Sequence, residues 1–375
     1  MKHYIYADNA ATTKLDVAAF EAMRPFLLEE YGNASQPYSF SRSVKTALKR
    51  SRQMIAECIG AQPDEIYFTS GGTEGDNWAI KGSFFSDNKK KTIITSQIEH
   101  HAILNACTAI ERLGGCQVIY LPVDTEGSVK PDTLEQLITD DTRLVSVMLS
   151  NNEIGTIQPI KTLANIAHQH GALFHTDAVQ AVGHIKIDVN VLGVDMLSAS
   201  AHKFNGPKGI GFLYIRKDTK IVPFCDGGTQ EFGMRAGTEN IPFIVGMAVA
   251  LKNNCDFLNE NQEYIRNLEN TLLSGLKKKN IDFVRNGINQ IPGNLNLSFK
   301  GKDGEAILHR LDLQGIAIST GSACDSVNTQ VSHVLQAIKL NDEYAKGTIR
   351  ITLGKNNSID DVDSIVSALY KVLKS

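Results

Sequence analysis

Short apolar runs alternate with amphipathic segments through the first two thirds of this 375-residue chain. The apolar runs predict strands at residues 65–69, 92–95, 118–121, 144–149, 173–176, 195–199 and 209–215. Helical periodicity separates several of them, for example over residues 102–113. Strands joined by helices form right-handed crossover units, which build a largely parallel sheet with helices on both faces. The alternation therefore predicts an α/β fold.

The pattern changes after residue 255. A long charged helix is predicted over residues 259–279, followed by strands at 294–299 and 348–352 with further helices around them. This mixture predicts a smaller C-terminal α+β domain, with its boundary within residues 252–262.

Charge and hydropathy exclude several classes of protein. The formal net charge is -3, so no basic field would recruit nucleic acid or an anionic membrane. The N-terminus reaches Asp8 almost at once and has no apolar signal-peptide core. The most apolar stretch, residues 241–251, is far shorter than the roughly 18 residues that suggest a membrane span, so we expect a buried helix there.

The six cysteines are scattered along the chain and form no C-x-x-C pair. This spacing argues against a secreted disulfide scaffold and against a zinc ribbon. It predicts a cytoplasmic protein whose thiols are reduced.

Polar residues gather directly after the predicted strands, where ligands bind in open α/β sheets. Ser70-Gly-Gly-Thr-Glu74 opens a helix and suits an anion, Asp177 suits a cationic ring nitrogen, and Lys203 can form a Schiff base. Glu99-His-His101 and Asn151-Asn-Glu153 follow two further strands. Together these segments predict a pyridoxal 5'-phosphate site.

Each segment also has a simpler interpretation. The glycines can form an ordinary turn, and Asp177 can cap the helix that follows it. Glu99-His-His101 and His168-Gln-His170 suggest a metal site, but neighbouring histidines on a helix point in different directions and a third ligand is missing. We therefore expect no metal.

Several motifs resemble the cysteine desulfurase family, in the aminotransferase-like (fold type I) group of pyridoxal phosphate enzymes. The resemblance covers nearly the whole chain. The motifs that carry it are Tyr6-Ala-Asp-Asn-Ala-Ala-Thr-Thr13, Phe68-Thr-Ser-Gly-Gly-Thr-Glu74, Asn151-Asn-Glu-Ile-Gly155, His175-Thr-Asp-Ala-Val-Gln180, Ser200-Ala-His-Lys203, Gly233-Met-Arg-Ala-Gly-Thr-Glu-Asn240 and Ser319-Thr-Gly-Ser-Ala-Cys324. It implies a large cofactor-binding domain at residues 14–255 and a small domain made of residues 1–13 and 256–375.

The resemblance also implies roles for individual residues. Lys203 would hold the cofactor covalently, and Asp177 would pair with its ring nitrogen. Gln180 would bond the ring hydroxyl, and His100 would stack on the ring. The phosphate would be held by Gly72, Thr73, Ser200 and His202. Thr238 would reach the phosphate of a neighbouring subunit, which implies a homodimer. Arg350 would bind the substrate carboxylate, and Asn152 would face cofactor and substrate.

Cys324 is expected to carry sulfur, because it lies in a run of small and polar residues where a thiol can ionise and move. The expected reaction converts L-cysteine to L-alanine, with Lys203 as base, His100 assisting proton transfer and a persulfide left on Cys324. The segment after Cys324 resembles the long-loop group, which passes persulfide to acceptor proteins such as an iron–sulfur scaffold or a tRNA-thiolating enzyme.

One departure from the family and three alternative functions remain. Where the family often has Asn-Pro-Ser-Ser-x-His, this chain has Asn33-Ala-Ser-Gln-Pro-Tyr38, so Tyr38 replaces a histidine. The same cofactor residues would serve a selenocysteine lyase or another lyase. A scaffold protein without catalysis is a further alternative, against which the set of Lys203, Asp177, His100 and Cys324 argues.

Overall fold

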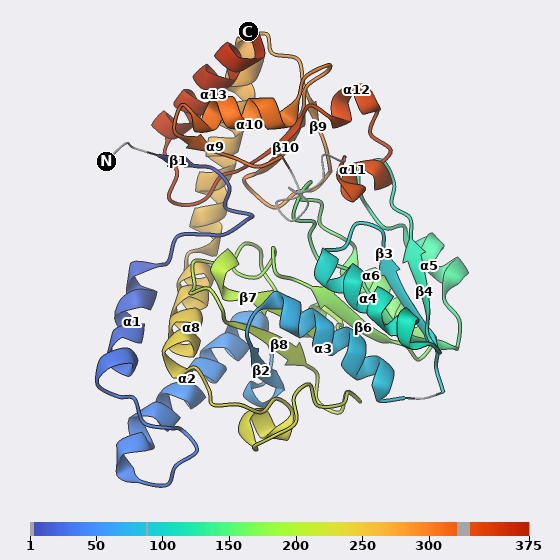
Figure 1. Ribbon diagram of the computed structural model, residues 1–375, viewed down its shortest axis with the longest axis vertical. Helices are drawn as coiled ribbons and strands as arrows, with labels where there is room; N and C mark the ends of the chain where they lie inside the picture. Colours follow the sequence, from blue (N-terminus) through green and yellow to red (C-terminus); the bar gives the residue numbers. More distant parts are fainter. Residues whose placement is uncertain (1–3, 88, 321–330, 375) are drawn as a thin grey trace.

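The computed structural model describes residues 4–87, 89–320 and 331–374. Within them, seven strands form one large sheet (Figure 1). From one edge to the other the strands are β2 (Ile66–Thr69), β8 (Gly211–Ile215), β7 (Met196–Ser200), β6 (Leu173–Asp177), β5 (Thr142–Ser146), β3 (Thr92–Ser96) and β4 (Gln117–Leu121). β8 runs antiparallel to β2 and β7, whereas the other neighbouring strands are parallel. The predicted α/β fold with a mainly parallel sheet is therefore confirmed.

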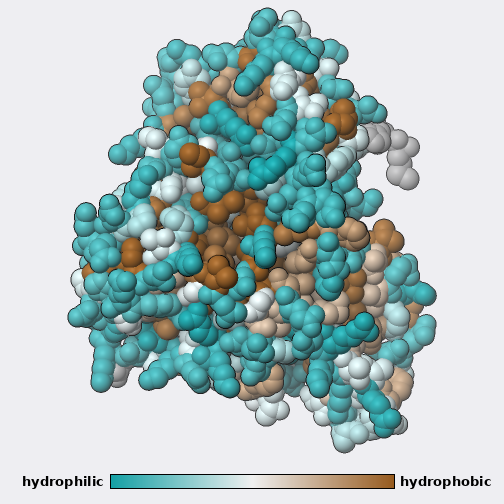
Figure 2. Space-filling model, turned by 180° about the vertical axis from the view of Figure 1, so that it is seen from behind, coloured by the Kyte–Doolittle hydropathy of each residue, from teal (hydrophilic) through white to brown (hydrophobic). Residues whose placement is uncertain are grey.

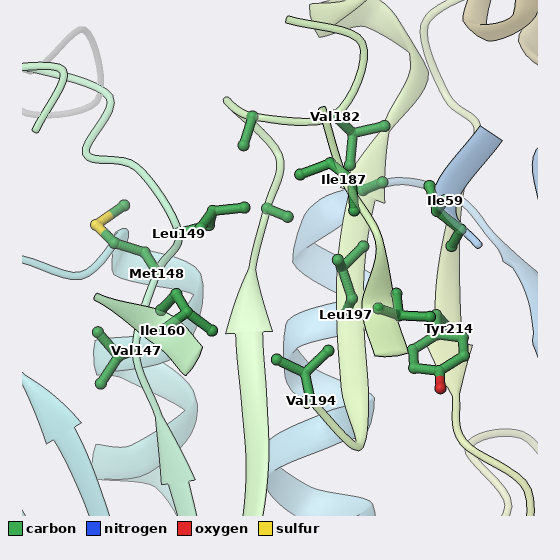
Figure 3. Packing of buried hydrophobic residues seen from close by; sticks show 14 of the residues in the cluster. Ile59, Val147, Met148, Leu149, Ile160, Val182, Ile187, Val194, Leu197 and Tyr214 are labelled. Atoms are coloured by element: carbon green, nitrogen blue, oxygen red, sulfur yellow. The ribbon is translucent and has the colours of Figure 1, made fainter. Parts of the chain in front are cut away.

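Helices cover both faces of this sheet because successive strand side chains point to opposite sides. In β7, Met196 packs in the cluster beneath α3 and α4, whereas its neighbour Leu197 packs in the larger cluster on the other face. Figure 3 shows part of this larger cluster, with Val182, Ile187, Leu197 and Tyr214 among its labelled side chains. The covering helices are α3 (Gly72–Phe85) and α4 (His101–Leu113) on one face, and α2 (Arg42–Ile59), α6 (Ile160–Gln169) and α8 (Ile241–Asp256) on the other.

The large-sheet region has one further long helix, α1, which packs against α8, and several short elements. They are α1 (Val17–Leu28), α5 (Pro131–Leu137), α7 (Val189–Leu192) and the 3₁₀ turns η1 (Ser39–Ser41), η2 (Pro63–Glu65), η3 (Ala201–Lys203) and η4 (Gln230–Gly233).

The C-terminal elements build a second, smaller core, at the top of Figure 1. An antiparallel sheet of β12 (Thr348–Thr352), β10 (Asn294–Ser298) and β9 (Val284–Arg285) packs with α9 (Leu258–Lys278), α10 (Gly304–Asp312) and α13 (Ile359–Lys374). The N-terminal strand β1 (Ile5–Tyr6) joins this part through parallel pairing with β11 (Ile316–Ala317). Two short helices follow in this region: α11 (His333–Ala337), whose Val334 and Leu335 pack in the larger cluster of the main sheet, and α12 (Asp342–Ala345). The limits of the two domains stay a prediction.

Two details differ from the sequence-based expectation or extend it. The strand predicted at residues 144–149 begins at Thr142 and ends at Ser146. Beyond it, the amides of Val147 and Leu149 still bond to carbonyls of β6, but Leu149 then accepts from the returning residue Gln158, so the chain turns. α8 and α9 meet at Phe257 with a bend of 73°.

In the described part of the chain, no single helix is long and apolar enough to cross a membrane; α8 and α9 pass that test only when taken together across their bend. Figure 2 shows apolar residues exposed across the middle of the opposite face, between the upper and lower parts.

Candidate active site

A cavity of about 520 Å³ lies at the carboxyl ends of the parallel strands, between the large sheet and the C-terminal elements. The segments that follow β2, β3, β5, β6 and β7 all reach it, as the rule for open α/β sheets requires. It brings together most of the residues expected at the site: His100, Asp177, Gln180, Gly72, Thr73, Asn152, Ser200, His202, Lys203 and Arg350.

Lys203 projects into this cavity from the turn η3, directly after β7. Its Nζ donates to the carbonyl oxygens of Ala10 (2.6 Å) and Ala11 (2.9 Å). The Gln180 amide also donates to the Ala10 oxygen, at 3.0 Å. The segment around Ala10 therefore forms one wall of the site and orients its amine, a contribution that the sequence analysis did not assign.

Asp177 ends β6 and is only 5% exposed. Its Oδ1 accepts a hydrogen bond from the Val179 amide at 2.9 Å, which fixes the carboxyl group at the cavity wall. Burial raises the pKa of Asp177, and His100 when protonated, the Val179 amide and the charge of Lys203 oppose that rise. A cation placed against Asp177 would therefore stabilise its charged form.

The N-terminus of the 14-residue helix α3 forms the opposite end of the cavity. Gly71 has φ +152°, and a Cβ on Gly72 would lie 2.5 Å from Cγ2 of Val179, so both positions need glycine. Without these side chains, the backbone amides at the helix start are open to a ligand, flanked by Thr73 and Ser200. This end of the cavity suits an anion.

Two histidines at the site are held neutral by burial. His100 caps α4, and its Nδ1 accepts from the Ala102 amide at 3.1 Å, so the neutral ring carries its proton on Nε2. Burial is the main cause that lowers the pKa of His100. The pKa of His202 falls to about 4, again through burial, and its Nδ1 lies 3.2 Å from the Thr12 hydroxyl.

Arg350 enters the cavity from β12 of the small sheet. Its Nη1 donates to the Asn152 carbonyl oxygen at 2.8 Å, and its Nη2 lies 2.7 Å from Oδ1 of Asp8. These contacts fix the plane of the guanidinium, and a fixed guanidinium can bind a carboxylate with two parallel hydrogen bonds. Asp8 belongs to one of the motifs noted in the sequence, yet its pairing with Arg350 was not predicted.

Two further histidines that sequence reasoning did not assign also line the cavity. His101 and His333 lie with their ring centroids 4.9 Å apart, and the ring Nε2 of His333 is 3.1 Å from the Glu99 carbonyl oxygen. His101 carried a sequence signal, as part of Glu99-His-His101, but His333 is isolated in the sequence and only the fold brings it here.

Two residues singled out in the sequence, Thr238 and Tyr38, do not line this cavity. Thr238 is exposed and lines a neighbouring hollow with Ser70 and Gly209 rather than the cavity itself. Tyr38 is 51% exposed and precedes η1, away from the residues that line the cavity. Cys324 lies outside the described residues.

The histidines considered as metal ligands have other partners. His168 is 2.8 Å from a carboxylate oxygen of Asp195, and His170 lies within 3.7 Å of Glu135 and Asp140. Across residues 4–87, 89–320 and 331–374, no group of three or more histidine, cysteine or acidic side chains is arranged to hold a metal ion.

The donor set of the cavity fits pyridoxal phosphate. The glycine-lined start of α3 offers amides to a phosphate, the buried Asp177 offers a carboxylate to a protonated ring nitrogen, and Lys203 offers an amine to the aldehyde. These three groups come from different elements yet face one space. The residues present therefore suit this cofactor.

Comparison with known proteins agrees with this assignment. The family model for aminotransferase class-V matches residues 5–365. The chain is 48% identical over its whole length to the cysteine desulfurase IscS of Dictyoglomus turgidum, covering 95% of that protein, and 46% identical over 99% of its length to the IscS of Methanosarcina thermophila, covering 92% of it.

Solved structures show the same relationship. A NifS-like protein superposes with a TM-score of 0.93 at 37% identity, covering 99% of this chain and 100% of the other. The structure described as SspA in complex with cysteine superposes with a TM-score of 0.84 at 36% identity, covering 94% of this chain and all of that one.

Fold and cavity thus define an enzyme of the pyridoxal phosphate-dependent, aminotransferase-like class. Within that class, the chain belongs to the cysteine desulfurase group of the class-V aminotransferase family.

Proposed function

We propose that this enzyme converts L-cysteine to L-alanine and passes the sulfur, as a persulfide on Cys324, to an acceptor protein. The observation that carries the proposal is the convergence of Lys203, Asp177 and Arg350 on one cavity. Arg350 would bind the substrate carboxylate and place the Cα of L-cysteine beside the amine of Lys203. Membership of the cysteine desulfurases supports this choice of substrate.

Lys203 would act as the base that removes the Cα proton. The carbonyls of Ala10 and Ala11 accept from its Nζ and so direct the amine toward the cavity. When bound, pyridoxal phosphate would supply a ring that withdraws electrons from the substrate Cα. Asp177 would keep the ring nitrogen protonated, and Gly72, Thr73, Ser200 and His202 would hold the phosphate.

His100 would exchange a proton with the substrate thiol. Its Nδ1 is occupied by the Ala102 amide, so proton transfer would take place at Nε2. Burial lowers its pKa and so favours the neutral ring, whose Nε2–H would donate to the substrate sulfur and stabilise the thiolate as the thiol loses its proton. Asn152 and Gln180 would complete the contacts to cofactor and substrate.

Sulfur transfer would use the Cys324 thiolate. A sulfur–sulfur bond forms between Cys324 and the substrate, the carbon–sulfur bond of L-cysteine breaks, and its electron pair stays on carbon, which takes up a proton to give L-alanine. Cysteine and one thiol thus become alanine and one persulfide, with no outside oxidant or reductant.

The test is incubation with L-cysteine, with alanine quantified and Cys324 analysed by mass spectrometry. We expect equal amounts of alanine and persulfide, and loss of both in Cys324→Ser. Normal sulfur release by Cys324→Ser would contradict the role of this residue. Purified protein that is colourless, and that stays so with added pyridoxal phosphate, would instead favour a scaffold without catalysis.

Selenocysteine lyase is the second candidate, because the same residues would hold a selenium substrate. Comparing kcat/KM for L-cysteine and L-selenocysteine separates the two. Strong preference for L-selenocysteine, with selenide released and Cys324→Ser fully active, would assign the chain to the lyase.

We also propose a cytoplasmic homodimer that serves an iron–sulfur scaffold or a tRNA-thiolating enzyme. Thr238 supports the dimer, because it is exposed beside Ser70 instead of lining its own cavity. Exposed apolar residues near α1 offer a surface that a second copy could cover: Phe20, Leu27, Leu28, Tyr31 and Phe40. Light scattering tests the dimer, and Thr238→Ala would weaken cofactor binding only if the partner copy contributes this residue.

A further inference from the structure

A second carboxyl group, Asp76, is buried next to Asp177 and has no part in the proposed reaction. Asp76 projects from α3, is 1% exposed and lines the same cavity. Its Oδ1 has no hydrogen-bond partner within the described residues. A buried polar atom without a partner is uncommon and calls for an explanation.

Side chains from three neighbouring strands form a series of hydrogen bonds that ends at the Asp76 carboxyl group. Ser146, His175 and Ser198 lie side by side on β5, β6 and β7, on the face that α3 covers. The Nδ1 of His175 is 2.9 Å from the Ser146 hydroxyl, and its Nε2 is 2.9 Å from the Ser198 hydroxyl. Ser198 in turn hydrogen-bonds Asp76, a contact that lowers the pKa of Asp76 and so opposes the effect of its burial.

No cation balances Asp76 in the described structure. His175 comes within 3.8 Å of Oδ1, but burial lowers its pKa to about 3 and the ring is neutral. The other titratable groups around Asp76 are acids: Asp177 on β6, and Glu99, whose own pKa burial raises to about 8. The positive charge of Lys203 acts on Asp177 instead.

An ionised Asp76 would therefore be a buried anion without a cation and close to a second anion, which is costly. Burial, followed by the charge of Asp177, raises the pKa of Asp76 well above its ordinary value. Asp76 and Asp177 thus differ in the charges that surround them, although both are buried at the same cavity.

We propose that Asp76 is a positioning residue for Asp177, placed by Ser198 and kept as the uncharged acid by burial without a cation, so that one negative charge, not two, faces the ring nitrogen of the cofactor. One carboxylate balances one protonated nitrogen and leaves the buried site neutral. The inference rests on the proposed function, in which Asp177 pairs with that nitrogen.

The test compares Asp76→Asn with Asp76→Ala in the full-length holoenzyme. Asparagine is neutral and nearly the same shape as the uncharged acid, whereas alanine removes the carboxyl group and leaves the Ser198 hydroxyl with His175 alone. The two readouts are the dissociation constant of pyridoxal phosphate and the pH midpoint of the bound cofactor's absorbance. We expect Asp76→Asn to match the wild type in both, and Asp76→Ala to bind the cofactor about tenfold more weakly.

A midpoint that falls by about one pH unit in Asp76→Asn would overturn the proposal, because removing a nearby anion favours loss of a proton from a cationic group. Ser198→Ala is the second variant, should Asp76→Asn fail to fold. It should weaken cofactor binding as Asp76→Ala does and leave the midpoint unchanged. Wild-type affinity in Ser198→Ala would show that Ser198 does not hold Asp76.

Asp177→Asn distinguishes this inference from the proposed function. It should lower both the midpoint and the cofactor affinity, because it removes the charge that faces the ring. If Asp177→Asn behaves as the wild type, the role proposed for Asp177 is wrong. If Asp177→Asn shifts the midpoint and Asp76→Asn shifts it as well, only the role proposed for Asp76 is wrong.

Discussion

Arg350→Lys tests how the enzyme recognises its substrate. The Arg350 side chain is 2% exposed and is fixed by Asp8 at 2.7 Å and by the Asn152 carbonyl at 2.8 Å. Lysine keeps the positive charge, but a single ammonium cannot hold these two partners and also present two parallel donors to a substrate carboxylate. The substitution therefore keeps the positive charge but removes the pair of parallel hydrogen-bond donors.

The magnitude follows from the hydrogen bonds lost. A hydrogen bond to a charged group contributes about 1.5–3 kcal/mol, and about 1.4 kcal/mol corresponds to a factor of ten. We therefore expect KM for L-cysteine to rise roughly 10- to 100-fold. The change in kcat should be far smaller, because Arg350 exchanges no proton and binds substrate and transition state alike.

Arg285→Lys is a matched control in the same small sheet. Arg285 also bonds one carboxylate, Glu269 at 2.7 Å, and one carbonyl oxygen, that of Asn294 at 3.3 Å, but it does not line the cavity. Steady-state alanine formation should give a wild-type KM for this variant, although both variants lose some thermal stability. An unchanged KM in folded Arg350→Lys would refute the assignment of the substrate carboxylate to Arg350.

Three further perturbations have defined outcomes. Gly72→Ala places a Cβ 2.5 Å from Cγ2 of Val179, so we expect cofactor affinity, measured by absorbance titration, to fall about tenfold and to recover with the added change Val179→Ala. If the double variant binds the cofactor as weakly as Gly72→Ala does, the clash with Val179 is not the cause of the loss. The pKa of Glu99 is near its ordinary value of 4.5 in the unfolded chain, but burial raises it to about 8 in the folded protein. The folded state therefore binds more protons between these two values, and stability decreases as pH rises through that window. Glu99→Gln lacks this ionisation, and its melting temperature relative to the wild type should increase from about pH 5 to about pH 8; a constant difference would show that Glu99 does not titrate there. Phe174→Ala removes a ring that is 0% exposed in the core and should lower the free energy of unfolding by about 3–5 kcal/mol in a denaturant titration, whereas a loss below about 1 kcal/mol would mean that the site collapses around the smaller side chain.

The architecture of the large sheet was predictable because it depends on local patterns. Residues 92–95 are all β-branched, which favours a strand, and the structure places the buried strand β3 at Thr92–Ser96. The end of β5 was not predictable. Val147 and Leu149 are as apolar as a strand requires, yet a hydrogen bond from Gln158 turns the chain away after Leu149.

The candidate site divides in the same way. Asp177 and Lys203 were found from residue type and position, because the ends of parallel strands converge at one edge of a sheet. Asp8 and Arg350 lie 342 positions apart, and no local pattern joins them. Asp76 looks like any polar residue in the first turns of a helix, and only the packing of α3 on β6 and β7 shows that it is buried without a cation.

The sequence by itself determined the order of strands and helices and the chemical groups available at the strand ends, because hydrophobic periodicity and residue type are local properties. The tertiary structure alone decided which of those groups share a cavity and how each is charged. Burial and neighbouring charges set the protonation of Asp76, Glu99, His100 and Asp177, and these depend on segments that meet only when the chain folds.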